Sequence, residues 1–113
     1  MLRKLIPAAI AAFALLATGA SFAQGWPTKP VTFVVPFPPG GSVDPLARLI
    51  GAKLSDSLGQ QFVVDNKPGA AGSIGAGAVA KAAPDGYTWL FVFDTHAVNP
   101  SLIPGLPFDT KKD

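Results

Sequence analysis

Two loops rich in glycine and proline are the segments of this 113-residue chain with the clearest capacity for chemistry. They cover 36–42 (PFPPGGS) and 66–73 (NKPGAAGS). Each is predicted to run into the start of a helix, where unpaired backbone N–H groups and the positive end of the helix dipole attract an anion. Glycines leave room for a ligand to approach the backbone. The pattern predicts an anion cradle built from backbone, with a carboxylate as its natural occupant. The glycines concerned are Gly40, Gly41, Gly69 and Gly72.

Polar side chains accompany both loops and a third segment at 94–100 (DTHAVNP). All three segments follow predicted strands, so in a parallel sheet they should lie at one edge, where open α/β sheets bind ligands. An alternative is that Gly-Gly and Pro-Gly only shape turns. The polar side chains within reach of a ligand are Ser42, Asp44, Ser73, Thr95 and His96.

Two catalytic motifs are near matches in the second loop. The run 69–75 (GAAGSIG), followed by Asp94, is similar to a dinucleotide-binding fingerprint, but the glycine spacing differs from G-x-G-x-x-G. The same run approaches the G-x-S-x-G nucleophile elbow, with Ser73 as nucleophile and Asp94 and His96 as partners. Because those partners are so close in sequence, they cannot easily take opposite sides of one imidazole. A small exported α/β hydrolase using Ser73 is the alternative from the enzyme class.

The composition disfavours metal and nucleic-acid binding. The chain has one histidine, no cysteine and no glutamate, so neither a metal site nor a cofactor is expected. Its formal charge is +2, but Arg3 and Lys4 belong to a predicted export signal. Without them the basic and acidic residues are equal in number, which leaves no basic patch for a nucleic acid.

Residues 1–23 are predicted to form a cleavable secretory signal peptide. A short basic head precedes an apolar stretch, and small residues close the segment at Ser21-Phe22-Ala23. Cleavage is expected after Ala23, which places the mature protein in the periplasm. An uncleaved N-terminal anchor is the alternative.

Three apolar runs predict β-strands at 31–35 (VTFVV), 61–64 (QFVV) and 88–93 (TWLFVF). Their near-continuous apolarity indicates strands covered on both faces, as in a parallel sheet. With a helix between each pair, the order predicts an α/β fold: a parallel βαβαβ unit with spatial strand order 2-1-3.

Helix signals fill both intervals between the strands. The first helix is predicted to have Asp44 as N-cap, Pro45 at its first position and Gly59 at its C-terminal end. The second is predicted to be capped by Ser73 and to run from Ile74 to about Ala83. The first helix carries residues that recur at helical spacing, namely Leu46, Leu49, Ile50, Lys53, Leu54 and Leu58.

Residues 26–109 resemble the N-terminal part of the tripartite tricarboxylate transporter substrate-binding family, also called the Bug family. Four motifs in this order carry the resemblance: P-F-P-P-G-G-S-x-D-x-x-A-R, V-x-N-x-P-G-A-x-G-x-x-G, A-P-D-G-Y-T and T-H-A-x-N-P. Lys67 stands where arginine is frequent in the family, and Ser73 where asparagine is frequent.

The resemblance implies a periplasmic receptor whose two α/β lobes close over a small carboxylate. Such a receptor delivers its ligand to the membrane permease subunits of a tripartite transporter or to a sensor. Family members are longer, so 24–113 is interpreted as the N-terminal portion of lobe one and the chain as a fragment, or else as a non-functional truncated remnant. The ligand-binding candidates carried over are Phe37, Gly40, Gly41, Ser42, Asp44, Ala71, Gly72, Ser73, Thr95 and His96.

Overall fold

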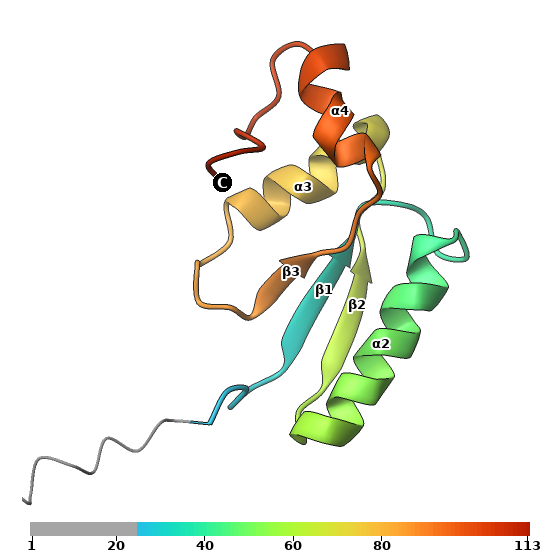
Figure 1. The fold of residues 1–113 in the computed structure, drawn as a ribbon, viewed down its shortest axis with the longest axis vertical. Helices are drawn as coiled ribbons and strands as arrows, with labels where there is room; N and C mark the ends of the chain where they lie inside the picture. The colour runs from blue at the N-terminus through green and yellow to red at the C-terminus, as the bar shows by residue number, and fades with distance from the viewer. Residues whose placement is uncertain (1–24) are drawn as a thin grey trace, which may run out of the picture.

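Three parallel strands form the sheet in the computed structural model of the chain, which describes residues 25–113 (Figure 1). They are β1 (Val31–Val35), β2 (Phe62–Asn66) and β3 (Thr88–Leu90). The order is β2-β1-β3, and β1 pairs in parallel with both neighbours. The predicted strand order is therefore confirmed.

Helices cover the sheet and extend beyond its carboxyl end. The helix α2 (Val43–Leu58) contacts β1 and β2, and α3 (Ser73–Ala80) contacts β1 and β3. A short 3-10 helix, η3 (Ala70–Gly72), precedes α3. The helix α4 (Thr95–Leu102) lies beyond the carboxyl end of β3 (Figure 1). Within residues 25–113 no helix has the length and apolarity needed to cross a membrane.

The core lies where α2 packs on β1. Phe33 and Val31 form one buried cluster with Phe62 of β2, and Val35 forms a second with Val43 and Ala47 of α2. Because side chains alternate along a strand, Val34 points to the opposite face, where it is also buried. Burial of each such side chain contributes roughly 1.5–3 kcal/mol. The apolar sequence of β1 thus fixes it as the central strand.

The first helix starts two residues earlier than predicted, and only part of the predicted apolar face, at Ile50 and Leu54, packs against the core. Its N-cap is Ser42, and Asp44 lies inside the helix, so the prediction of an Asp44 cap was wrong. Leu46 and Leu49 are exposed, although their spacing suggested core positions. The reason is Gly51, which lets the helix backbone approach Phe62, where a Cβ would lie 3.3 Å from the carbonyl oxygen.

The predicted C-terminal glycine of this helix is confirmed. Gly59 has φ 71°, in the left-handed region, and its N–H donates to the carbonyl oxygen of Ser55 at 3.0 Å. This bond closes the last turn of the helix.

The third strand is shorter than predicted, and the segment after it is helical. The ladder to β1 ends at Leu90, with one further bond from the Phe91 N–H to the Val34 oxygen at 2.9 Å. Pro36 follows β1 and has no N–H with which to continue the ladder. The segment 94–100, expected to be a loop, instead has Asp94 as N-cap and enters α4.

The second helix also differs at both ends. Gly72 is its N-cap, and Ser73 is its first residue rather than its cap. The Ser73 hydroxyl donates to the Ala70 oxygen at 2.8 Å, within the preceding 3-10 turn. The helix ends at Ala80, before the expected Ala83, because 84–86 (PDG) begins the turn toward β3.

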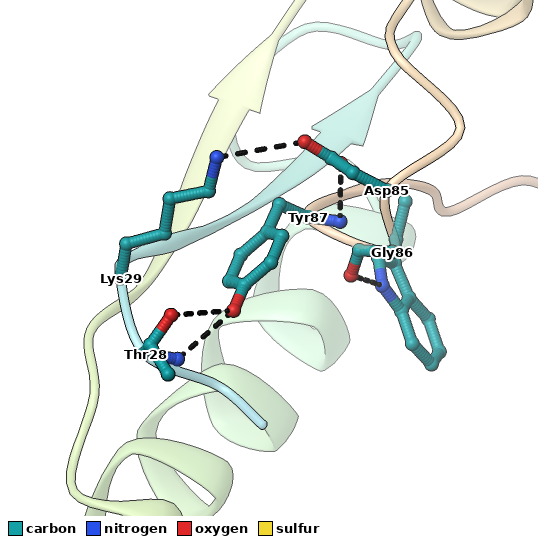
Figure 2. Close-up of polar contacts among 6 residues, drawn as sticks. Thr28, Lys29, Asp85, Gly86 and Tyr87 are labelled. Carbon is teal, nitrogen blue, oxygen red and sulfur yellow. Dashed lines mark hydrogen bonds and ion pairs between the residues drawn. The ribbon is translucent and has the colours of Figure 1, made fainter. Parts of the chain in front are cut away.

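The amino edge of the sheet is held by contacts between residues 26–29 and the approach to β3 (Figure 2). The Tyr87 hydroxyl accepts from the Thr28 N–H at 2.9 Å, and Lys29 pairs with Asp85 at 3.5 Å. Trp26 and Trp89 stack with ring centroids 6.2 Å apart, each nearly half exposed. These contacts fasten the start of the described chain to the sheet, at the opposite end from the glycine-rich loops.

Replacing Gly75 by alanine should destabilise the fold. An alanine Cβ would lie 2.6 Å from the Pro36 Cβ and 3.0 Å from the Lys67 backbone oxygen. Helix propensity alone would give a gain of about 1 kcal/mol, whereas overpacking costs about 1–3 kcal/mol. Urea denaturation should therefore give a lower free energy of unfolding for Gly75→Ala.

The control is Ala78→Gly, at an exposed position of the same helix. It should lose about 1 kcal/mol through propensity alone. A Gly75→Ala chain at least as stable as wild type would contradict the close packing of α3 on Pro36.

Candidate functional site at the carboxyl edge of the sheet

Three segments that are distant in sequence meet beyond the carboxyl ends of the strands (Figure 1). Loop one covers 36–42, and loop two covers 67–72. Gly72 packs on loop one, since a Cβ there would lie 3.7 Å from the Phe37 ring. Directly before the third segment, 94–100, lies Phe93, whose ring centroid is 5.4 Å from that of Phe37. The sheet topology therefore assembles the predicted loops on one edge.

Loop one presents backbone donors at the start of α2. Gly40 has φ +85°, a conformation that favours glycine, and Gly41 and Ser42 are exposed. The N–H groups of Ser42 and Val43 donate to no other atom of the described residues. They lie in the first turn of α2, where the helix dipole is positive. This end of loop one can bind a carboxylate oxygen without any cationic side chain.

Loop two has an unusual backbone. Gly69, Ala70, Ala71 and Gly72 all have positive φ, at 126°, 48°, 55° and 88°. Left-handed alanine costs roughly 1–2 kcal/mol per residue, so the surrounding contacts must hold this conformation. The Gly72 N–H donates to the Gly69 oxygen at 3.0 Å, and Asn99 of α4 donates to the Ala71 oxygen at 3.0 Å.

This backbone leaves exposed N–H donors in loop two. Consecutive residues in such conformations form concave groups of N–H donors that bind anions. The N–H groups of Gly69, Ala70 and Ala71 have no partner among the described residues, and all three residues are exposed; Ala71, directly before the N-cap Gly72 of α3, lies nearest the helix.

Asp44 lies beneath loop one and is buried. Its Oδ2 accepts from the Gly40 N–H at 3.2 Å and from Arg48 Nε at 3.0 Å. Its Oδ1 accepts from Asn66 Nδ2 at 2.9 Å. These bonds, led by that from Arg48, lower the pKa of Asp44 to about 2. The carboxylate is thus occupied by protein donors, and it shapes the loop instead of facing a ligand.

The remaining predicted side chains are dispersed. Thr95 is exposed at the first position of α4. His96 stacks on Phe108 with ring centroids 5.6 Å apart, and it lines a cavity of about 120 Å³ together with Ala76 of α3. Ser73 is buried and bonded to Ala70. Because no hydrogen bond joins Ser73 to His96 among the described residues, the pair required of a hydrolase is not formed.

Three residues of this edge were missed by the sequence reasoning. Arg48 follows Asp44 by one helical turn, a spacing that favours an ion pair. Asn66 is the last residue of β2, at the edge where the loops meet. Asn99 lay in the segment expected to be a loop.

Lys67, in contrast, pairs with Asp65 at 3.0 Å and is partly exposed. No cluster of three metal-binding side chains occurs in the part of the chain that the structure describes.

Comparison with known proteins gives a consistent result. The family model described as "Tripartite tricarboxylate transporter family receptor" matches residues 46–113. Protein BugT of Bordetella pertussis is 47% identical over 93 residues, which cover 80% of this chain and 28% of that protein. A protein of Pseudomonas sp. strain P51 is 41% identical over 98% of this chain and 33% of its own length. The chain therefore spans about a third of these curated relatives.

Solved structures agree with this match. Rpa4515 of Rhodopseudomonas palustris, solved with adipate, is 45% identical with a TM-score of 0.74, covering 78% of this chain and 30% of that one. MatC of the same organism, with bound malate, is 42% identical with a TM-score of 0.71, covering 77% and 30%. The periplasmic binding protein BugD is 40% identical with a TM-score of 0.72, covering 75% and 28%.

Protonation of Asp44 should weaken the fold in acid. Its pKa of about 2 lies below the ordinary 3.8. A carboxylate whose pKa is lower in the folded state stabilises the fold above about pH 4, and this contribution is lost as the pH falls through about 2. Denaturant midpoints of wild type should therefore fall over that range, and the fall should be smaller in Asp44→Asn.

Asp65→Asn is the matched control, because it removes a carboxylate next to Asn66 that pairs with the partly exposed Lys67. Its denaturant midpoint should fall between about pH 4 and 2 as much as that of wild type, because the Asp44 contacts are intact. If Asp44→Asn and wild type lost stability in parallel, these contacts would not be the source of the acid sensitivity.

Proposed function

The chain belongs to the tripartite tricarboxylate transporter receptor family, and we propose that it carries half of the binding site of a periplasmic receptor for a small carboxylate. The observation that carries this proposal is the convergence of two loops with free backbone N–H groups at one edge of the sheet. The donors are those of Ser42 and Val43 in loop one and of Ala71 in loop two.

The charges around the site favour recognition by backbone. Arg48 donates to Asp44 and Asn66, and Lys67 pairs with Asp65, so both nearby cations already have partners. Neutral N–H donors at a helix start suit a carboxylate, which accepts several hydrogen bonds at once. That adipate and malate occupy two of the related structures supports a dicarboxylate as ligand.

A receptor is favoured over an enzyme. The hydrolase alternative needs a base beside the Ser73 hydroxyl, yet that hydroxyl donates to Ala70 and His96 packs on Phe108. A receptor needs only shape and donors, which both loops supply. The residues proposed to line the site are Phe37, Gly41, Ser42, Val43, Ala71 and Gly72.

The wider setting is part of the same proposal. Residues 1–23 would act as an export signal cleaved after Ala23; this segment lies outside the residues that the structure describes. The described chain would form part of lobe one, and a second lobe would close over the ligand. The loaded receptor would deliver its carboxylate to the permease subunits of a tripartite transporter or to a sensor.

Binding should depend on loop geometry more than on cations. Gly41→Val places a branched side chain on the exposed face of loop one and should abolish binding of malate and adipate. Lys67→Ala removes an exposed charge that already has a partner and should cost at most about 1 kcal/mol of binding free energy. Titrations followed by backbone amide NMR would measure both, with the signals of Ser42, Val43 and Ala71 expected to shift and saturate.

The two variants control for each other. Gly41→Val changes the shape of loop one, whereas Lys67→Ala changes the charge of loop two. Loss of binding in Lys67→Ala with retention in Gly41→Val would overturn the backbone cradle in favour of a direct ion pair. Conversion of the ligand or of an activated ester by wild type would instead support the hydrolase.

A further inference from the structure

We propose that Asn66 and Arg48 are positioning residues of the carboxylate site, acting together with Asp44 as a clamp that fixes loop one to the end of β2. This inference rests on the proposed function. The clamp is defined as the three side chains Asp44, Arg48 and Asn66.

Asp44 connects the clamp to loop one. Its carboxylate accepts from the Gly40 N–H, four residues earlier in the chain, at 3.2 Å. The bond removes the Gly40 donor from the ligand and bends the loop, so that the next free donors are those of Ser42 and Val43. The direction of these two N–H groups therefore depends on where the Asp44 carboxylate lies.

Asn66 makes a second connection to loop one. Its amide nitrogen donates both to the Phe37 oxygen at 3.1 Å and to Asp44 Oδ1 at 2.9 Å. It is the last residue of β2, and the following Lys67 N–H still bonds to the Val35 oxygen at 2.8 Å. Asn66 is thus anchored to the sheet, and it holds loop one at a fixed distance from the start of loop two.

Arg48 completes the clamp and balances its charge. Its Nε donates to Asp44 Oδ2 at 3.0 Å, and its Nη2 donates to Asn66 Oδ1 at 3.1 Å. An unneutralised Asp44 beneath an anion site would repel a carboxylate ligand. Because Arg48 is committed to Asp44 and Asn66, it offsets this repulsion without being the group that binds the ligand.

The clamp residues are not members of the two apolar clusters of the core, which are made by β1, α2 and Phe62. Its bonds reach only loop one, α2 and the end of β2. Its removal should therefore change the loops more than the sheet. A purely structural role would lower stability and leave the affinity of the folded chain unchanged, whereas a positioning role changes that affinity.

Malate titration of the full chain by amide NMR tests the clamp. Sucrose would favour the folded state without adding an anion, and the temperature would be kept well below unfolding. Asn66→Ala and Asp44→Asn should each weaken malate binding by about tenfold or more, as expected when buried donors or acceptors lose their partners. In both variants the Gly40 amide signal should move in the absence of malate.

Two further variants sharpen the result. Asp65→Asn, next to Asn66 but outside the clamp, should bind malate within about twofold of wild type, as expected of an exposed pair. The double variant Asp44→Asn/Asn66→Ala should bind malate as tightly as the single variant with the lower affinity. The losses of affinity do not add, because the two residues act as one unit. If Asn66→Ala does not fold, Arg48→Gln, which alters a largely exposed side chain, takes its place with the same expected loss.

The outcomes separate the clamp from the proposed function. A wild-type chain that is folded but does not respond to malate or adipate refutes the receptor proposal. A wild-type chain that binds malate, together with clamp variants that bind it equally well, refutes the clamp alone. Weaker binding in the clamp variants with Asp65→Asn unaffected supports both.

Discussion

The parallel pairing of β1 with strands on both sides is the constraint on which the candidate site depends. A parallel ladder sends every strand out of the sheet at the same edge, so the segments that follow must meet there. The ladder places Val35 beside Asn66, and the next residues are Pro36 and Lys67. Pro36 in turn packs against α3 through Gly75. The distance between the two loops is therefore set by backbone hydrogen bonds of the sheet, before any side chain of the site contributes.

Recognition of an anion by backbone has a physical cost and an advantage. The cost appears in loop two, where Ala70 and Ala71 hold left-handed conformations that side chains disfavour. Contacts from Ser73 and Asn99 maintain them. The advantage is that N–H donors fixed in this way need no reorganisation when a ligand arrives, which lowers the entropic cost of binding. The charged side chains nearby serve the loops: Arg48 balances Asp44, and Lys67 pairs with Asp65.

The fold was predictable from the sequence wherever apolar periodicity and turn residues agreed. The runs of β-branched residues located β1 and β2, and Gly59 marked the end of α2. The orientation of α2 was only partly predictable, because the leucine spacing included the exposed Leu46 and Leu49, whereas Ala47 and Gly51 are the buried residues that face the sheet. Small residues bring a helix close to a sheet, but they carry little hydrophobic signal. The α4 helix was missed because DTHAVNP has the composition of a loop.

The candidate site was predictable in position but not in the roles of its side chains. Glycine-rich loops after parallel strands indicated the correct edge. Asp44 was expected to contact a ligand, and only the structure places it beneath Gly40 with three donors around it. His96 was expected near the loops, and only tertiary packing reveals its contact with Phe108. A side chain's type and spacing do not determine which of two neighbouring surfaces it faces.

A crystal structure of the chain with malate is the most direct test of recognition by backbone. We expect a ligand carboxylate within hydrogen-bond distance, about 2.7–3.2 Å, of the backbone nitrogens of Ser42 or Val43 and of Ala71. Arg48 should remain bonded to Asp44 in that complex. A carboxylate paired directly with the Arg48 guanidinium or with Lys67, and with these backbone nitrogens left without a ligand oxygen, would contradict it.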